Sequence, residues 1–281
     1  MKYLNLGCGS HYSKSGEWTN LDFVSTGEGV LAHNLLKGIP FNNECFDLVY
    51  HSHVLEHFSK KDGVQFIAEC FRVLKPGGIL RIAIPDLEGI AGNYLKCIEE
   101  GIKDPGNDLI RANYEWMLLE MYDQTVRNKS GGDMGNYLAQ DTILNESFVY
   151  SRIGEEGRAF RRMIVLSKQE KDNSTISSKK KWSSYGTIKA IMSRIKFLVF
   201  RFFGLDTNTY EIGKFRISGE IHQWMYDRYS LTRLLISKGG TSIVTRNAFD
   251  SYIVNWADYN IDGKNNIIRK PDSLFMEAIK K

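Results

Sequence analysis

Residues 3–10 read Y-L-N-L-G-C-G-S and decide the fold that this sequence predicts. Residues 3–6 form a short apolar strand, and Gly7 and Gly9 then allow a tight turn whose backbone N–H groups can approach a ligand closely. Asp22 ends the next predicted strand, where its carboxylate can accept hydrogen bonds from vicinal ribose hydroxyls. The sequence therefore predicts a site for a ligand that contains a ribose.

A dinucleotide phosphate site is not expected at this turn. The first two strands follow each other too closely for the long helix whose N-terminus holds the phosphates. In addition, His11-Tyr12 stand where the third glycine of the dinucleotide fingerprint would lie. A ligand with a ribose but no phosphate fits the pattern better.

Short apolar strands alternate with turns and helices over the first 86 residues, as in a parallel sheet of strand–helix–strand units. The helix after the fourth strand is predicted to begin with Asp62 as its cap and to end at Pro76-Gly77-Gly78. The regular pattern returns near the end of the chain. The predicted strands are 3–6, 18–21, 30–31, 46–50, 79–84, 242–245 and 274–279, and the late helix is 230–238.

Between these parts lies a segment of different character. Residues 87–150 are expected to be helical, 168–184 to form an exposed loop rich in Ser and Lys, and 187–203 to form a basic amphipathic helix. Such a helix either packs on its own protein or lies in an anionic membrane interface. The expected organisation is a core of 1–86 and 222–281, interrupted by a helical substrate-binding insertion at 87–221.

The composition is that of an ordinary globular protein and argues against collagenous, disordered and membrane-embedded classes, with 281 residues, 42% hydrophobic residues, 25% charged residues and a mean hydropathy of −0.32. The formal net charge is 37 − 33 = +4. Residues 158–201 carry twelve Lys and Arg against Glu170 and Asp172, a local net of +10, so the rest carries −6. Because the basicity belongs to one segment, a nucleic-acid partner is not expected.

The cysteines and the N-terminus bear on the compartment. The four cysteines, Cys8, Cys45, Cys70 and Cys97, lack the spacing of a metal site or of a disulfide framework, so free thiols and no metal are expected. The N-terminus lacks the apolar stretch and cleavage site of an export signal. We therefore expect a cytoplasmic protein, with peripheral contact at the inner face of the membrane if 187–203 lies there.

Five motifs in order resemble those of class I S-adenosylmethionine-dependent methyltransferases. They are L-N-L-G-C-G, N-L-D-F, I-P-F-(x)4-F-D-L-V-Y, H-V-L-E-H and R-V-L-K-P-G-G-I-L. More narrowly, the whole length is similar to predicted methyltransferases found in bacterial surface-polysaccharide gene sets, including S-G-E-I-H-Q-W-M-Y-D-R-Y-S-L and K-P-D-S-L-F-M-E. The resemblance implies a doubly wound, Rossmann-like sheet of seven strands with an antiparallel last strand, and a helical insertion between strands five and six.

The resemblance also implies which residues bind S-adenosylmethionine. The backbone of Gly7 and Gly9 would approach its methionine part, Asp22 its ribose and Asn34 its adenine amino group. His51, which opens the loop after strand four, would lie beside the methionine amine. Asn5 and Asn34 replace acids that are common in the family, which keeps hydrogen-bonding capacity but not charge. The full implied set is Asn5, Gly7, Cys8, Gly9, Ser10, His11, Asp22, Asn34, Leu35 and His51.

Methyl transfer to oxygen or nitrogen usually requires a base that removes one proton, and bases should lie beyond the carboxyl ends of the strands. His222 is the first candidate, because it returns the chain from the insertion to the core. His53 is the second and Asp86 the third. His57 is expected to be a structural histidine, since it lies a helical turn beyond the strand end.

The insertion supplies the candidates for acceptor binding. Asp123 and Arg127, at positions i and i+4, share a helix face; they either bind hydroxyls of a polar acceptor or form a plain surface ion pair. Tyr122 and Tyr226 could stack on a sugar, although such aromatic residues more often pack in a helical core. The predicted acceptor-binding set is Tyr122, Asp123, Gln124, Arg127 and Tyr226.

The predicted reaction is transfer of a methyl group from S-adenosylmethionine to a hydroxyl of a sugar, a nucleotide sugar or a surface glycan. Two alternatives remain at this point: a methyltransferase that acts on a small non-sugar metabolite, and a non-catalytic module that binds S-adenosylmethionine. The sequence leaves the acceptor, the methylated position and the oligomeric state open.

Overall fold

The computed structural model describes the backbone of residues 1–176 and 206–281, and the side chains of 1–167 and 206–281. Its centre is a seven-stranded sheet in the order β3-β2-β1-β4-β5-β9-β6. Strands β1 to β5 pair in parallel, whereas β9 is antiparallel to both β5 and β6. The strands are β1 (Tyr3–Leu6), β2 (Trp18–Asp22), β3 (Val30–Ala32), β4 (Phe46–Ser52), β5 (Leu74–Pro85), β6 (Gly240–Arg246) and β9 (Ser273–Lys280). The expected doubly wound sheet with a reversed last strand is confirmed.

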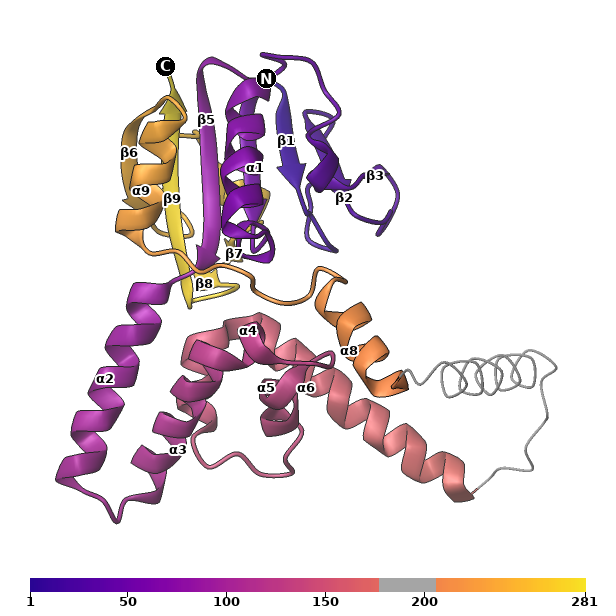
Figure 1. The fold of residues 1–281 in the computed structure, drawn as a ribbon, viewed down its shortest axis with the longest axis vertical. Coiled ribbons are helices and arrows are strands. Elements are labelled where there is room, and N and C mark those ends of the chain that lie inside the picture. Colours follow the sequence, from indigo (N-terminus) through magenta and orange to yellow (C-terminus); the bar gives the residue numbers. More distant parts are fainter. Residues whose placement is uncertain (177–205) are drawn as a thin grey trace.

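Helices α1 (Lys60–Val73) and α9 (Arg228–Ser237) lie on one face of this sheet (Figure 1). Their apolar side chains enclose the main core with those of the central strands; Ile67, Leu74 and Leu231 are among its fully buried members. Burial of such side chains stabilises the fold by about 1.5–3 kcal/mol each.

The ends of α1 differ from the sequence prediction. Its N-cap is Ser59, whose hydroxyl accepts the N–H of Asp62 at 3.1 Å, so Asp62 lies inside the first turn. The helix ends at Val73, and Pro76-Gly77-Gly78 falls within β5. The pairing of β5 with β4 jumps there, from Phe46 opposite Leu74 to Leu48 opposite Ile79, because the extra residues form a bulge.

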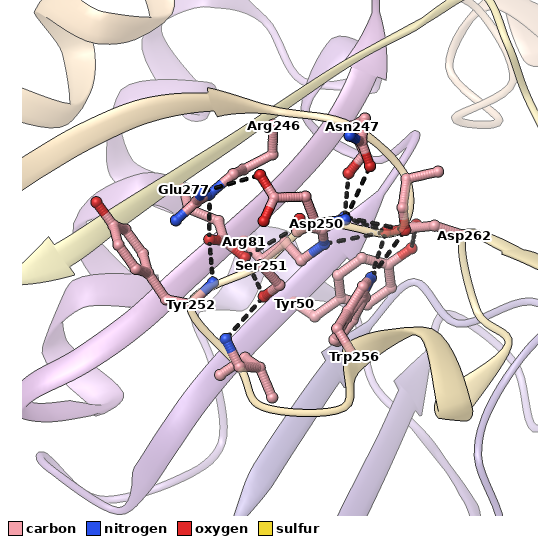
Figure 2. Close-up of polar contacts among 12 residues, drawn as sticks. Tyr50, Arg81, Arg246, Asn247, Asp250, Ser251, Tyr252, Trp256, Asp262 and Glu277 are labelled. Carbon is pink, nitrogen blue, oxygen red and sulfur yellow. Dashed lines mark hydrogen bonds and ion pairs between the residues drawn. The ribbon is translucent and has the colours of Figure 1, made fainter.

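A buried charge network holds the other face of the sheet (Figure 2). Arg81 of β5 is fully buried and donates to Asp262 and Glu277 at distances of 2.8 to 3.0 Å. It also donates to the backbone carbonyls of Asn247, Ala248 and Asp250. The segment between β6 and β9, including η4 (Trp256–Tyr259), β7 (Gly263–Lys264) and β8 (Ile267–Ile268), is thereby fixed to the sheet.

The described helices between β5 and α9 gather below the end of the sheet where β1 and β5 point (Figure 1). Most of them enclose a second core that contains fully buried Trp116 and Met117. The elements are α2 (Leu87–Lys103), α3 (Asp108–Leu118), η3 (Leu119–Asp123), α4 (Gln124–Val126), α5 (Gly132–Leu138), α6 (Glu146–Ile176) and α8 (Thr207–Arg216). This region lies against the carboxyl ends of the strands, where α/β sheets bind ligands.

Two predictions for this region change or remain open. Residues 168–176 belong to α6 rather than to an exposed loop, and 177–184 lie outside the described residues. The basic segment 187–203 also lies outside them. Within the described ranges 1–176 and 206–281, no helix is both long and apolar enough to cross a membrane.

The four cysteines are free thiols, as expected.

Candidate active site

The glycine turn after β1 has the backbone geometry that the sequence predicts. Gly7 and Gly9 have φ angles of 65° and 54°, which residues other than glycine rarely adopt. A Cβ on Gly7 would clash with Val54 Cγ2. Asp22 completes the turn, because its Oδ2 accepts the N–H of Gly9 at 2.8 Å. The turn is thus fixed by the residue that was expected to bind the ribose.

A cavity of about 440 Å³ opens on this turn. The space above Gly9 is empty, since a Cβ built there meets no atom within 4 Å. Burial raises the pKa of the Cys8 thiol to about 11, so the cavity holds a neutral thiol. Six predicted cofactor residues line this cavity: Asn5, Gly7, Cys8, Gly9, Ser10 and His11. The other lining residues are Tyr50, Ser52, His53, Glu156, Ala159, Phe160, Met163, Arg269 and Lys270.

The other predicted cofactor residues, Asp22, Asn34, Leu35 and His51, lie outside this lining, although Asp22 accepts the N–H of Gly9, which lines it. Asn34 accepts the N–H of Leu36 at 2.9 Å and so caps η1 (Leu35–Lys37), in which Leu35 packs against the main core. His51 is fully buried on the opposite face of β4, where its ring contacts Phe66 of α1. Side chains alternate along a strand, so Tyr50 and Ser52 face the cavity and His51 does not.

A second cavity, of about 400 Å³, lies between the sheet and the helical region. It shares His53, Glu156, Phe160 and Lys270 with the first cavity. Its remaining polar lining comprises Glu56, His57, Gln124, Arg127, Ser130, Glu220, His222 and Asp272. The two cavities therefore adjoin, and His53 is a candidate base that faces both.

His53 is held firmly in an unusual backbone conformation. Its φ is 53°, a value that is uncommon without glycine and often marks functional positions. Its Nε2 lies 2.8 Å from Ser273 Oγ, and its Nδ1 lies 3.3 Å from Oε1 of Glu56. Burial, followed by nearby Lys270, lowers the pKa of His53 well below its usual range. The ring is thus neutral and oriented by two polar neighbours.

Glu56, His57 and His222 form a compact cluster beside His53. His222 Nε2 lies 4.0 Å from Glu56 Oε1, and the ring centroids of His57 and His222 are 5.0 Å apart. Burial lowers the pKa of both histidines and raises the pKa of Glu56 to about 8. His57 was expected to be structural, but it lines the second cavity with the other two.

Of the predicted acceptor residues, Gln124 and Arg127 line the second cavity. Asp123 and Arg127 are a buried pair at 3.0 Å rather than a surface pair. The Asp123 carboxylate also accepts the N–H groups of Asp133 and Met134 at the start of α5, so its acceptor capacity is used inside the protein.

Three further candidates lie elsewhere. Tyr122 is 55% exposed, and Tyr226 is buried in the main core. Asp86, at the start of α2, is absent from the lining of both cavities, and its Oδ1 is buried without a hydrogen bond among the described residues. The structure therefore brings His53 and His222 together and leaves Asp86 apart.

Sequence reasoning missed several lining residues. Glu56 stands inside the motif H-V-L-E-H and could have been found there as the acid between two histidines. Glu156 and Phe160 of α6 gave no signal, because nothing in a helical pattern shows which cavity it closes. Lys270 joins α6 to the cavities through Glu156, 3.1 Å away.

Comparison with known proteins agrees with this fold. Residues 20–82 match the family described as methyltransferase domain. Over 56 residues the chain is 38% identical to a probable S-adenosylmethionine-dependent methyltransferase of Mycolicibacterium smegmatis, covering 20% of this chain and 21% of that protein. The chain thus spans about a fifth of the curated relative that it matches. Part of the sheet is therefore similar to a methyltransferase domain, and the relative that it matches is described as dependent on S-adenosylmethionine.

Two solved structures are similar over nearly the whole chain. A methyltransferase of Archaeoglobus fulgidus is 13% identical, with 99% of this chain and 86% of that chain covered and a TM-score of 0.37. A methyltransferase of Thermotoga maritima, described as a possible histamine N-methyltransferase, is 11% identical, with 100% and 82% covered and a TM-score of 0.36. The strand order of the sheet carries the fold assignment.

Proposed function

We propose that this chain is a methyltransferase that uses S-adenosylmethionine to methylate a hydroxyl of a sugar, a nucleotide sugar or a surface glycan. The observation that carries the proposal is the junction of two cavities at His53, one opening on the glycine turn and the other on polar groups of the helical region. Donor and acceptor need adjoining sites because methyl transfer is an in-line displacement over about 3 Å.

The residues of the first cavity fit the cofactor. The open space above Gly9 leaves room for a ligand against the backbone. Asp22 lies beside this cavity, partly exposed, with one oxygen engaged by Gly9. When bound, S-adenosylmethionine supplies an electrophilic methyl group on a sulfonium sulfur. The side chains of Phe160 and Met163 on α6 close the cavity on its other side and would exclude water.

The geometry favours His53 as the base that removes the acceptor's proton. It faces both cavities, whereas His222 faces the second one only. Glu56 lies at Nδ1 of the ring and orients it, which is the usual arrangement of a base held by a third group. Ser273 Oγ, at Nε2, either gives way to the acceptor hydroxyl or relays its proton. The sequence ranked the candidate bases as His222, then His53, then Asp86. We now rank His53 first.

The polar lining of the second cavity suits an acceptor with many hydroxyls. Gln124 and Arg127 at α4 and Glu220 in the segment before α9 offer donors and acceptors from two separate parts of the chain. A small non-sugar metabolite remains the alternative acceptor, and contact of 187–203 with a membrane that carries a lipid-linked glycan remains a proposal. A non-catalytic module is disfavoured, because such a module has no need for a second cavity beside the cofactor.

Calorimetry with S-adenosylmethionine tests the cofactor site. Asp22→Ala removes the ribose acceptor and the Gly9 contact, so affinity should fall at least about tenfold, given 1.5–3 kcal/mol per charge-assisted hydrogen bond. Asp108→Ala, at an exposed position of α3, is the matched control and should bind as the unaltered chain does. Equal dissociation constants for Asp22→Ala and Asp108→Ala would place the cofactor elsewhere.

A screen of nucleotide sugars and extracted cell-surface glycans, with labelled methyl donor, tests the reaction. With an acceptor found, His53→Asn should lower kcat by about 10²–10⁴, the usual effect of losing a general base. Asparagine tolerates the positive φ at this position, so the backbone is kept. His33→Asn, outside both cavities, is the control. A loss below about fivefold at saturating acceptor would move the role to His222.

A further inference from the structure

We propose that Glu56, His57 and His222 form a binding site for one divalent transition-metal ion in the wall of the second cavity. Each residue offers one ligand atom, and the three atoms lie within 4.8 Å of one another. All three side chains line the same cavity. The sequence predicted no metal site, because metal-site motifs are recognised by ligands close together along the chain. Here the ligands come from two distant segments.

Backbone hydrogen bonds build this cluster. The carbonyl oxygen of Glu56, in η2 (Leu55–His57), accepts the N–H groups of Gln223 and Trp224 at 2.7 and 3.2 Å. Gln223 Nε2 donates to the carbonyl of His57 at 2.8 Å. These contacts fix the segment that returns from the helical region directly against η2. The three ligands are therefore held in place by the main chain on both sides.

The tautomer of His57 suits a ligand role. Its Nδ1 lies 3.1 Å from the carbonyl oxygen of Ile221 and must donate to it, because a carbonyl only accepts. The lone pair is then on Nε2. A metal-binding histidine commonly donates its other ring N–H to a backbone carbonyl in this way.

Glu56 supplies an independent observation. Its side chain is 1% exposed, and neither carboxyl oxygen makes a hydrogen bond among the described residues, although His53 Nδ1 lies 3.3 Å from Oε1. Burial of an unpartnered polar group costs free energy, and charged groups in such places are usually paired or bound to a metal. A cation between Glu56 and the two imidazoles would supply the missing partner.

The positive charges near the cluster are already neutralised. Lys270 pairs with Glu156 at 3.1 Å, and Arg127 pairs with Asp123 and Glu220 at 3.0 and 3.4 Å. The other titratable neighbours are His53, the buried acid Asp272 and Tyr226. The cluster therefore presents a carboxyl group and imidazole lone pairs to the cavity, and each cation near it among the described side chains is paired with an acid.

The ligand set selects the class of metal. Two imidazoles and one carboxylate suit Zn²⁺, Co²⁺ or Fe²⁺ rather than Mg²⁺ or Ca²⁺, which prefer oxygen ligands. Metal–ligand bonds of about 2.0–2.2 Å require the side chains to close in by roughly 1 Å. Three protein ligands leave the remaining positions open toward the cavity. There an acceptor hydroxyl could bind and become more acidic beside His53, a role that rests on the proposed function.

Titration of Co²⁺ into the tag-free, chelator-treated full chain tests the site. We expect one equivalent to bind, with visible absorption bands of protein-coordinated Co²⁺, and Zn²⁺ to compete for it. Glu56→Gln and His222→Asn should each lower the affinity at least about tenfold, as loss of one of three ligands does. His33→Asn, outside the cluster, is the matched control and should bind normally. Circular dichroism checks that each variant is folded, and His57→Asn serves as a third ligand variant.

Two results would overturn the proposal: no stoichiometric binding, or binding that all three ligand variants leave unchanged. Competition by Mg²⁺ as strong as that by Zn²⁺ would also contradict the ligand set. The readout needs neither S-adenosylmethionine nor an acceptor. A chain that binds no Co²⁺ yet methylates its acceptor would refute the metal site alone. A chain that binds Co²⁺ but not S-adenosylmethionine would refute the proposed function alone.

Discussion

Two buried charged clusters in this molecule differ in how completely their polar atoms are paired. Around Arg81, each guanidinium nitrogen donates at least one hydrogen bond, to Asp262, Glu277 or a backbone carbonyl (Figure 2). Glu56 lines a cavity, and both its carboxyl oxygens lack hydrogen bonds among the described residues, with His53 Nδ1 3.3 Å from Oε1. The Arg81 cluster fixes a segment to the sheet, whereas the Glu56 cluster lacks hydrogen-bond partners beside a cavity and can bind a ligand.

The difference has a physical cause. A fully paired buried charge gains hydrogen bonds that offset its desolvation, so it fixes structure and binds nothing further. An unpaired one keeps its desolvation cost until a ligand, a metal or a proton arrives. Complete pairing therefore indicates a structural role, and incomplete pairing beside a cavity indicates a functional one.

Replacement of Arg81 should have the largest effect on stability. Arg81→Met leaves Asp262 and Glu277 buried without their cation, so the free energy of unfolding should fall by about 3–5 kcal/mol. Urea unfolding followed by circular dichroism measures the loss. Lys75→Met, on the same strand, breaks a partly exposed pair with Asp47 and should cost less than about 1 kcal/mol.

A second variant covers the case in which Arg81→Met does not fold. Arg81→Lys keeps the charge but loses the planar set of donors, and should still cost more than Lys75→Met. If both Arg81 variants lost no more free energy of unfolding than Lys75→Met, the network would not stabilise the fold. The contrast between the two clusters would then be wrong.

His51 should make the pH dependence of stability steeper. Burial lowers its pKa from 6.5 to about 3, so as pH falls the unfolded chain takes up a proton that the folded chain refuses. Stability from this residue is present above pH 6.5 and is lost as pH falls below it. Between about pH 6 and 4, His51→Leu should reduce the slope by nearly 1.4 kcal/mol per pH unit.

Urea unfolding of both proteins at several pH values measures this slope. Identical slopes would mean that His51 is hydrated or paired in the folded protein. His51 and Glu56 would then behave differently although both are buried without a hydrogen bond. Burial without a partner would then no longer indicate a functional group.

Glu56→Gln should be the variant that does not lower stability. Burial raises the pKa of Glu56 to about 8, so at neutral pH the buried carboxyl costs stability that the neutral amide of Gln does not. In chelator-treated protein the free energy of unfolding should therefore stay unchanged or rise. Thermal unfolding at neutral pH measures it. A loss as large as that of Arg81→Met would show that Glu56 is a structural partner of His53, and the two clusters would then be of one kind.

The sheet and its glycine turn could be predicted from sequence because their signals are local. Short apolar strands, the glycines of residues 3–10 and Asp22 lie at positions that the structure confirms. The ends of α1 were wrong because Ser59 supplies the cap and a bulge in β5 absorbs the Pro76-Gly77-Gly78 turn. Competing local contacts of this kind are not visible in a single sequence.

The candidate site was only partly predictable. His53 and His222 were proposed from their places in the chain, and Asp123 and Arg127 from their spacing, as acceptor-binding residues or a surface ion pair. Burial decided their roles: it turned the Asp123 carboxylate inward to α5, and it placed His51 under α1 rather than beside the cofactor cavity. Which way a side chain faces depends on neighbours that are distant in sequence.

The sequence by itself determined the short strands of the parallel sheet, the glycine turn and the acid that completes it, because each follows from short-range periodicity and backbone freedom. Only the tertiary structure decided that Glu56 meets His222 and that α6 closes both cavities. Those contacts join segments far apart in the chain through backbone hydrogen bonds and packing, as from Glu56 to Gln223. No local pattern encodes such a meeting, since its free energy comes from the assembled fold.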